Sequence, residues 1–268
     1  MDLINSSQNH HSDLWDRFAQ DDPLFAILSE ENRKGLKWDL VEFFQTGEDL
    51  LYPEIEEILG KYELKSKVRA LDFGCGVGRL SRCLLRYFDV VYGIDVSKEM
   101  ISLARELNPD AEKINFLDRS EPGLKEFKDA TFDFVLSLIV VQHIPKKHIF
   151  DYLESLIRIT RKDGLLFLQI PAKEIRYPGK PINSGNPHAL KKLFRRTSRS
   201  IRTKWQSWKQ QTGRFTKKKE PYFLMSCISP ATLFRFFEGK GCKIIRLRED
   251  YSTGENFLSY DYLIRKLD

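Results

Sequence analysis

The chain shows two patterns of apolar and polar residues, which change near residue 65. In the first sixty residues, apolar positions over 15–28 and 51–62 recur every three or four residues, as on one face of a helix. This pattern predicts a helical N-terminal region. Pro23 and Pro53 are predicted to stand at helix starts, and Gly47 to lie in a turn that lets this region bend.

From Val68 onward, short apolar runs alternate with segments of helical spacing. The predicted strands cover 68–73, 89–95, 113–117, 132–138 and 164–170, and the helices between them cover 79–88, 97–108 and 146–159. Such alternation is typical of a parallel sheet built from right-handed βαβ units. After Pro171 the alternation stops, and a helix over 229–241 and strands over 242–250 and 257–267 are predicted farther on.

The positive charge of the chain is concentrated in one segment. The 268 residues include 44 Lys and Arg and 38 Asp and Glu, but 175–219 holds fourteen of the bases and no acid, so the rest of the chain is acidic. Apolar residues of this segment share one predicted helix face; they are Leu190, Leu193, Phe194, Ile201, Trp205 and Trp208. The pattern fits a helix on anionic lipid, a nucleic-acid contact, a cap over an active site, or a helix packed on the body of the protein.

Composition excludes several classes of protein. Hydrophobic residues make up 41% of the chain and charged residues 31%, as in a globular protein. No apolar run reaches the roughly 18 residues of a membrane-spanning helix, and the N-terminus lacks the pattern of a secretory signal. The four cysteines lie far apart, so no metal site is predicted. We expect a cytoplasmic protein.

The most specific motif is LDFGCGVGRL at 71–80, which follows a predicted strand and opens a helix. Its glycines permit a tight turn and a close approach of the backbone to a ligand, although a lone motif of this kind also fits an ordinary strand-to-helix turn. The next strand ends at Asp95, whose carboxylate can accept hydrogen bonds from ribose hydroxyls. Arg79 stands where the dinucleotide pattern requires a small residue, and the Asp72 carboxylate would repel phosphate, so a pyrophosphate fits poorly here. The motif therefore indicates a nucleoside ligand that is cationic at the Asp72 end.

Three segments resemble the successive motifs of class I S-adenosylmethionine-dependent methyltransferases: ALDFGCGVGRL (70–80), YGIDVS (92–97) and FDFVLSLIVVQHIP (132–145). The resemblance is close over about 65–171. It implies a three-layer α/β Rossmann-like fold, with a seven-stranded, mostly parallel sheet whose final strand is antiparallel. The implied parts are a helical cap (1–62), a cofactor-binding core (63–171), a basic substrate-side insert after the fifth strand (172–224), and a helix and two strands completing the sheet (225–268).

The resemblance also implies S-adenosylmethionine as cofactor and a set of residues that bind it. These are Asp72, Gly74, Cys75, Gly76, Gly78, Asp95, Val96, Met100, Asp118, Arg119, Ser137 and Leu138. Asp72 is expected near the methionine part, Asp95 at the ribose, and Val96 and Met100 beside the adenine. Asp118 stands where related enzymes bind the adenine amino group, but the sequence departs here from the usual form, and a helix cap or turn residue is the alternative.

His143, just past the fourth strand, is the candidate catalytic residue. If the acceptor is a hydroxyl, a histidine is a natural general base for its proton; the alternative is a structural residue that closes the loop. Tyr177, His188 and Tyr222 flank the basic helix and are candidate acceptor contacts. The N-terminal aromatics are expected to cover the site or, alternatively, to pack in the core; they are Trp38, Phe43, Phe44 and Tyr52.

The expected function is O-methylation of a small hydroxylated acceptor or of one linked to a glycan or lipid. An anionic membrane surface is expected as a further contact of 189–219, and nucleic acid is not expected as a partner. One alternative is a non-catalytic, cofactor-binding partner subunit that binds nucleic acid through the basic helix. Another is an RNA or protein methyltransferase, although no NPPY-like motif follows the fourth strand, which disfavours a base nitrogen. The sequence does not predict an oligomeric state.

Overall fold

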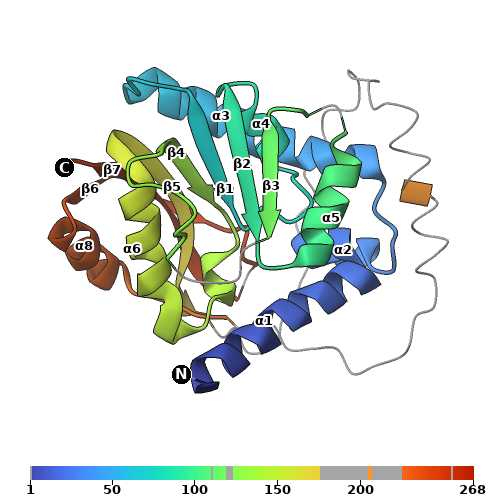
Figure 1. The fold of residues 1–268 in the computed structure, drawn as a ribbon. Coiled ribbons are helices and arrows are strands. Elements are labelled where there is room, and N and C mark those ends of the chain that lie inside the picture. The colour runs from blue at the N-terminus through green and yellow to red at the C-terminus, as the bar shows by residue number, and fades with distance from the viewer. Residues whose placement is uncertain (1, 110, 119–122, 176–204, 207–224, 255) are drawn as a thin grey trace.

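The protein is built on a seven-stranded sheet with the strand order β3-β2-β1-β4-β5-β7-β6 (Figure 1). The computed structural model describes residues 2–109, 111–118, 123–175, 205–206, 225–254 and 256–268. The strands are β1 (Arg69–Phe73), β2 (Val90–Asp95), β3 (Ile114–Asp118), β4 (Phe132–Ser137), β5 (Thr160–Glu174), β6 (Cys242–Asp250) and β7 (Phe257–Lys266). Neighbouring strands from β3 to β5 pair in parallel, whereas β7 runs antiparallel to both β5 and β6. The predicted fold class is confirmed, with the antiparallel last strand inserted beside β5.

Helices cover both faces of the sheet. They are α1 (Asp2–Asp21), α2 (Pro23–Ile27), α3 (Leu40–Lys61), α4 (Ser81–Leu84), α5 (Lys98–Leu107), α6 (Ile149–Ile159) and α8 (Pro230–Gly239), with the 3-10 turns η1 (Glu31–Arg33), η2 (Val141–His143) and η3 (Lys146–His148). Buried residues of α3, α4 and α5 share a core with one face of the strands, and those of α6 and α8 share a core with the other. The central strands are therefore buried on both sides, which explains their continuous apolar runs.

Helix α3 is longer than the sequence indicates. It runs unbroken from Leu40 to Lys61, with Gly47 and Pro53 inside it, so the predicted turn at Gly47 and helix start at Pro53 are wrong. Pro53 lies on the exposed face of the helix. At Gly47 a Cβ atom would lie 2.9 Å from the carbonyl oxygen of Arg79, so this glycine permits close helix packing and not a bend. Pro23 does begin a helix, as predicted.

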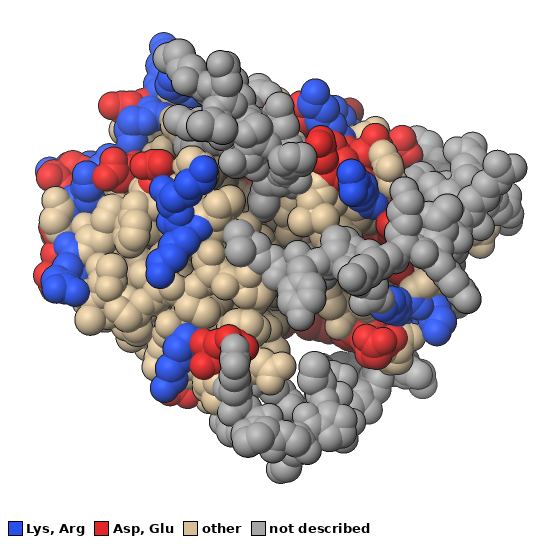
Figure 2. Space-filling model, turned by 90° about the horizontal axis from the view of Figure 1, so that it is seen from below, with Lys and Arg blue, Asp and Glu red and all other residues tan. Residues whose placement is uncertain are grey.

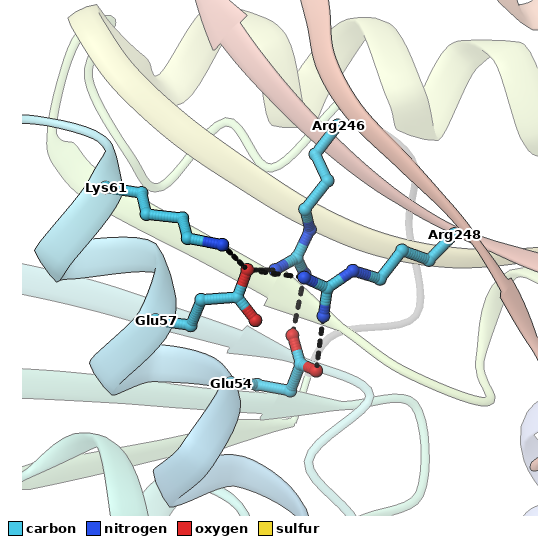
Figure 3. Close-up of polar contacts among 5 residues, drawn as sticks. All are labelled: Glu54, Glu57, Lys61, Arg246 and Arg248. Carbon is cyan, nitrogen blue, oxygen red and sulfur yellow. Dashed lines mark hydrogen bonds and ion pairs between the residues drawn. The ribbon is translucent and has the colours of Figure 1, made fainter.

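A cluster of ion pairs joins α3 to the edge strand β6 (Figure 3). Arg246 Nη2 lies 2.7 Å from Glu54 Oε2, and Arg248 contacts both Glu54 and Glu57. Lys61 Nζ lies 2.9 Å from Glu57 Oε1. Hydrogen bonds from Arg248 and then Lys61 lower the pKa of Glu57 to about 2. This α3–β6 cluster (Glu54, Glu57, Lys61, Arg246 and Arg248) ties the N-terminal region to the far edge of the sheet.

The described ends of the basic insert are anchored in the core. The Ile228 amide donates to the Pro171 carbonyl at 2.8 Å, so the chain just before the insert and the chain just after it meet. We call these two points the roots of the insert. Ser226 donates from its amide to the Gln142 carbonyl at 2.7 Å and from its hydroxyl to the Ile144 carbonyl at 3.0 Å. Most of 172–224, including Trp208, lies outside the described residues. Trp205 is described and is 4% exposed, in one apolar cluster with residues of the N-terminal helices.

Within the part of the chain that the structure describes, none of the helices combines the length and the apolar character needed to cross a membrane.

Candidate functional site

A cavity opens at the carboxyl ends of β1, β2 and β4, next to α1 and α2. It encloses about 1050 Å³ of empty space, including its open mouth. Helix α1 runs past this edge of the sheet (Figure 1), and Figure 2 looks onto the same edge. The lining comes from the glycine loop (72–76 with Arg79 and Leu80), the end of β2 (94–96), the loop after β4 (138–145), and Trp15, Ala26, Ile27, Met100 and Tyr152. Segments far apart in sequence therefore build one cavity.

The glycine loop needs its glycines. Gly74 and Gly76 have φ angles of +79° and +52°, which favour glycine. A Cβ atom at Gly74 would lie 2.3 Å from Val140 Cγ2, and one at Gly76 would lie 2.6 Å from Ile27 Cδ1. The loop thus contacts both the wall after β4 and the N-terminal helices. Gly78 (φ +82°) shapes the same turn, but faces Phe116 and does not line the cavity.

Asp95 is held at the cavity wall by backbone donors. Its Oδ2 accepts a hydrogen bond from the Gly76 amide and its Oδ1 one from the Ser97 amide, both at 2.9 Å. Burial raises its pKa, and these backbone bonds lower it in part. A carboxylate has about four acceptor positions, so Asp95 retains capacity to accept hydrogen bonds from a ligand.

Asp72 is a second carboxylate at the same end of the cavity, and unlike Asp95 it is buried. It is 2% exposed, and the Ser81 hydroxyl donates to its Oδ2 at 2.6 Å. Burial raises the pKa of Asp72 to about 6, and the charge of Asp95 adds to this, whereas Ser81 and Arg79 oppose it. A positively charged ligand group would offset the unfavourable burial of both carboxylates.

Arg79 is a site residue that sequence analysis missed, because we considered only its size. It lines the cavity, is 4% exposed, and donates from Nη1 to Thr46 Oγ1 at 3.2 Å. Burial lowers its pKa to about 10. No acceptor for its buried Nε lies among the described residues. Arg79 and Asp72 thus place one cation and one anion among the residues that line the cavity, and the guanidinium also lies over the Phe43 ring, 5.9 Å from its centre.

The other end of the cavity is largely apolar and contains His143. The His143 amide donates to the Val140 carbonyl at 2.9 Å, which begins the η2 turn. The imidazole ring packs edge-on against Trp15, with ring centres 5.2 Å apart. The two hydrogen bonds of Ser226 hold the loop on either side of His143. The apolar residues around it are Leu138, Ile139, Val140, Ile144, Pro145 and Tyr152.

The structure brings most of the predicted cofactor residues to this cavity. Those that line it are Asp72, Gly74, Cys75, Gly76, Asp95, Val96, Met100 and Leu138. Ser137 is fully buried behind the wall. Asp118 pairs in register with Asp95 but is not part of the lining, in contrast to its predicted role. Arg119, Tyr177, His188 and Tyr222 lie outside the described residues.

Of the two interpretations of the N-terminal aromatic residues, the structure supports packing in the core and not a cover over the cavity. Trp38, Phe43 and Phe44 are buried in a core cluster with residues of α5, and Tyr52 packs on the core beneath α3. Trp15, Ala26 and Ile27 line the cavity instead. The helical spacing of the apolar residues indicated a buried face, but it could not indicate which residues meet the cavity and which meet α5.

Part of this chain is similar in sequence to known methyltransferases. Residues 71–168 match the family model described as a methyltransferase domain. A ubiquinone biosynthesis O-methyltransferase of Pelagibacter ubique is 28% identical over 128 residues, 45% of this chain and 52% of that protein. A 2-methyl-6-phytyl-1,4-hydroquinone methyltransferase of Synechocystis is 34% identical over 97 residues, 36% of this chain and 30% of that protein. The match thus spans about half or less of these relatives.

The fold also has close counterparts among solved structures. The magnesium protoporphyrin IX methyltransferase of Synechocystis, solved with bound S-adenosylmethionine, covers 97% of this chain and 96% of its own, with a TM-score of 0.58 and 15% identity. At that identity the likeness concerns the fold alone. The motifs, the cavity and the family match together show that residues 71–168 form a class I S-adenosylmethionine-dependent methyltransferase domain.

Proposed function

We propose that this chain transfers a methyl group from S-adenosylmethionine to a hydroxyl oxygen of a small acceptor, free or linked to a glycan or lipid. One observation carries the proposal. A single cavity presents the glycine loop, the buried carboxylate of Asp72 and the partly buried carboxylate of Asp95 at one end, and a histidine in an apolar wall at the other.

The residues at the first end fit the cofactor. Gly74 and Gly76 line the cavity with a backbone turn that only glycine adopts without strain, and Asp95 has acceptor capacity for ribose hydroxyls. Asp72 suits an ammonium group, and the buried Nε of Arg79 offers a donor to a carboxylate. When bound, the cofactor supplies a methyl group on a positively charged sulfur. Since this charge disappears during transfer, positioning of the acceptor supplies most of the rate.

His143 has the chemistry to complete the reaction. As the acceptor oxygen forms its bond to the methyl carbon and the carbon–sulfur bond breaks, the hydroxyl proton must leave. The imidazole takes this proton and later returns it to water. Trp15 packs against the ring and restricts its orientation.

The wall around His143 supports an acceptor with an apolar body. Two relatives are named for ubiquinone and for a phytyl hydroquinone. A hydroquinone is a hydroxylated ring, so these names are consistent with a hydroxyl acceptor on an apolar body. Trp205 is buried among residues of the N-terminal helices, which makes it unsuitable as a stacking platform for nucleic-acid bases.

The basic residues of 189–219 support a contact with an anionic membrane surface, at which a lipid-linked acceptor would be met. Sedimentation with vesicles tests this contact. Binding to vesicles that contain phosphatidylglycerol but not to neutral vesicles is expected, and equal binding to both contradicts it.

The proposed function is tested by calorimetry with S-adenosylmethionine and by release of S-adenosylhomocysteine over a panel of hydroquinones, phenols, hydroxylated lipids and sugars. His143→Gln should lower kcat at least about 100-fold and leave cofactor affinity within about twofold. His148→Gln is the matched control, because His148 does not line the cavity. Cofactor binding without turnover on any acceptor would favour the non-catalytic alternative.

A further inference from the structure

A buried polar side chain supports the cavity wall from behind. Gln169 lies in β5 and is 1% exposed. Its Oε1 accepts a hydrogen bond from the Ile139 amide at 3.1 Å, and its Nε2 donates to Thr253 Oγ1. The Ser259 hydroxyl donates to the same Thr253 oxygen at 2.7 Å. Because the Ile139 amide can only donate, the amide group of Gln169 has one possible orientation, which directs its donor to Thr253.

The residue that Gln169 holds has a strained backbone. Ile139 has a φ angle of +61°, in the left-handed region. This conformation is a rare exception for a β-branched residue, and it persists only where surrounding contacts impose it. The hydrogen bond from its amide to Gln169 is such a contact.

The conformation of Ile139 determines where the cavity wall after β4 lies. Ile139 lines the cavity, and the next residue, Val140, packs directly over Gly74. The Val140 carbonyl accepts the hydrogen bond from the His143 amide that begins η2. A change in the backbone at Ile139 would therefore move Val140 relative to the glycine loop and displace His143 with it.

We infer that Gln169 is a positioning residue, which fixes Ile139 in its left-handed conformation and so sets the distance between the glycine loop and His143. This inference rests on the proposed function for its catalytic consequence. Gln169 itself does not line the cavity, so it acts only through Ile139. Thr253 and Ser259, from the β6–β7 region, in turn fix Gln169.

The first test compares Gln169→Leu with the native protein, using the acceptor identified by the panel. Gln169→Leu should lower kcat at least about tenfold and leave the Kd for S-adenosylhomocysteine within about threefold. Gly60→Ala is a control for expression and handling, because no atom other than its chain neighbours and the backbone of its own helix lies within 4 Å of the added methyl. Turnover within twofold of native, or an equal loss of cofactor affinity and turnover, would overturn the inference.

A second variant separates positioning from a general loss of packing. Glycine adopts a φ of +61° without strain, so Gln169→Leu should lower kcat less than about threefold when it is made in the Ile139→Gly protein. If the loss is the same in both backgrounds, Gln169 does not act through the conformation of Ile139.

The conformational part of the inference has a readout that needs no acceptor. The δ1-methyl signals of Ile139 and Ile144, labelled with carbon-13, should be single in the native protein bound to S-adenosylhomocysteine. In Gln169→Leu they should broaden or split, while methyl signals of α6 stay unchanged. Unchanged signals of Ile139 would overturn the inference, even if no acceptor turns over and the proposed function fails.

Discussion

The two ends of the cavity are built in different ways. The cofactor end comes from one strand–loop–helix unit and the end of the neighbouring strand. Its charged groups are Asp72 and Arg79, which are buried, and Asp95, which is partly buried. The acceptor end is assembled from α1, the loop after β4 and α6, and it is mostly apolar around His143. If the proposed function holds, a ligand common to many enzymes is held by local backbone geometry, whereas a particular acceptor is contacted by segments that are distant in sequence.

The largest expected effect is a loss of cofactor affinity when the glycine loop is changed. Gly76→Val adds a β-branched side chain at a φ of +52°, where its Cβ would lie 2.6 Å from Ile27 Cδ1. We expect the affinity for S-adenosylmethionine to fall at least about 100-fold, measured by calorimetry, in a protein that still unfolds cooperatively. Gly60→Ala should bind normally. Normal binding by Gly76→Val would show that the loop does not contact the cofactor.

The next effect concerns stability. The pKa of Asp72 rises from 3.8 unfolded to about 6 folded. Between these values the folded protein holds a proton that the unfolded chain has released, so the contribution of Asp72 to the unfolding free energy falls as pH rises through this window. Asp72→Asn should therefore stabilise the protein at pH 7.5 by up to roughly 3 kcal/mol.

The stabilisation by Asp72→Asn should be smaller at pH 5, and the variant should bind S-adenosylmethionine more weakly than the native protein. Urea unfolding at both pH values measures the first effect, and calorimetry the second. If Asp72→Asn is no more stable than the native protein at pH 7.5, the ionised Asp72 carboxylate does not destabilise the folded protein.

A smaller effect is expected at the ribose position. Asp95→Ala removes charge-assisted hydrogen bonds and should weaken cofactor binding at least about tenfold. Asp118→Ala is the matched control, since Asp118 ends the neighbouring strand in register with Asp95 but does not line the cavity. Its affinity should stay within about threefold of native. If the two variants lose affinity equally, Asp118 belongs to the cofactor end.

The smallest effect lies away from both ends, in the α3–β6 cluster. A double-mutant cycle with Glu54→Gln and Arg248→Gln should give a coupling energy of about 0.5–1 kcal/mol in urea unfolding. These side chains are 25% and 41% exposed, so solvent screens their interaction. Cofactor affinity should not change. A change in affinity would mean that this cluster helps to shape the cavity and is not only a link between α3 and β6.

The difference between locally built parts of the molecule and parts assembled from distant segments explains what the sequence could predict. All seven strands were predicted, because buried strands carry local apolar runs, and the glycine loop and Asp95 were found because motif and spacing lie within one βαβ unit. The continuity of α3 was missed, since Pro53 and Gly47 are both helix breakers by propensity. The helix tolerates Pro53 on its exposed face, and at Gly47 it packs closely against Arg79. Trp15, Ile27 and Tyr152 were missed because only tertiary packing brings them to the cavity.

The meeting of Pro171 and Ile228 has a consequence for how such a chain can diversify. This backbone hydrogen bond brings the residues before and after the intervening chain together at one point of the core. The entropy of closing a flexible loop grows only logarithmically, by about 0.6 kcal/mol for each doubling of length. A change of length between residue 175 and Ser226 that leaves Trp205 in its apolar cluster would therefore have little effect on the stability of the sheet, and acceptor preference could change while the cofactor end stays the same.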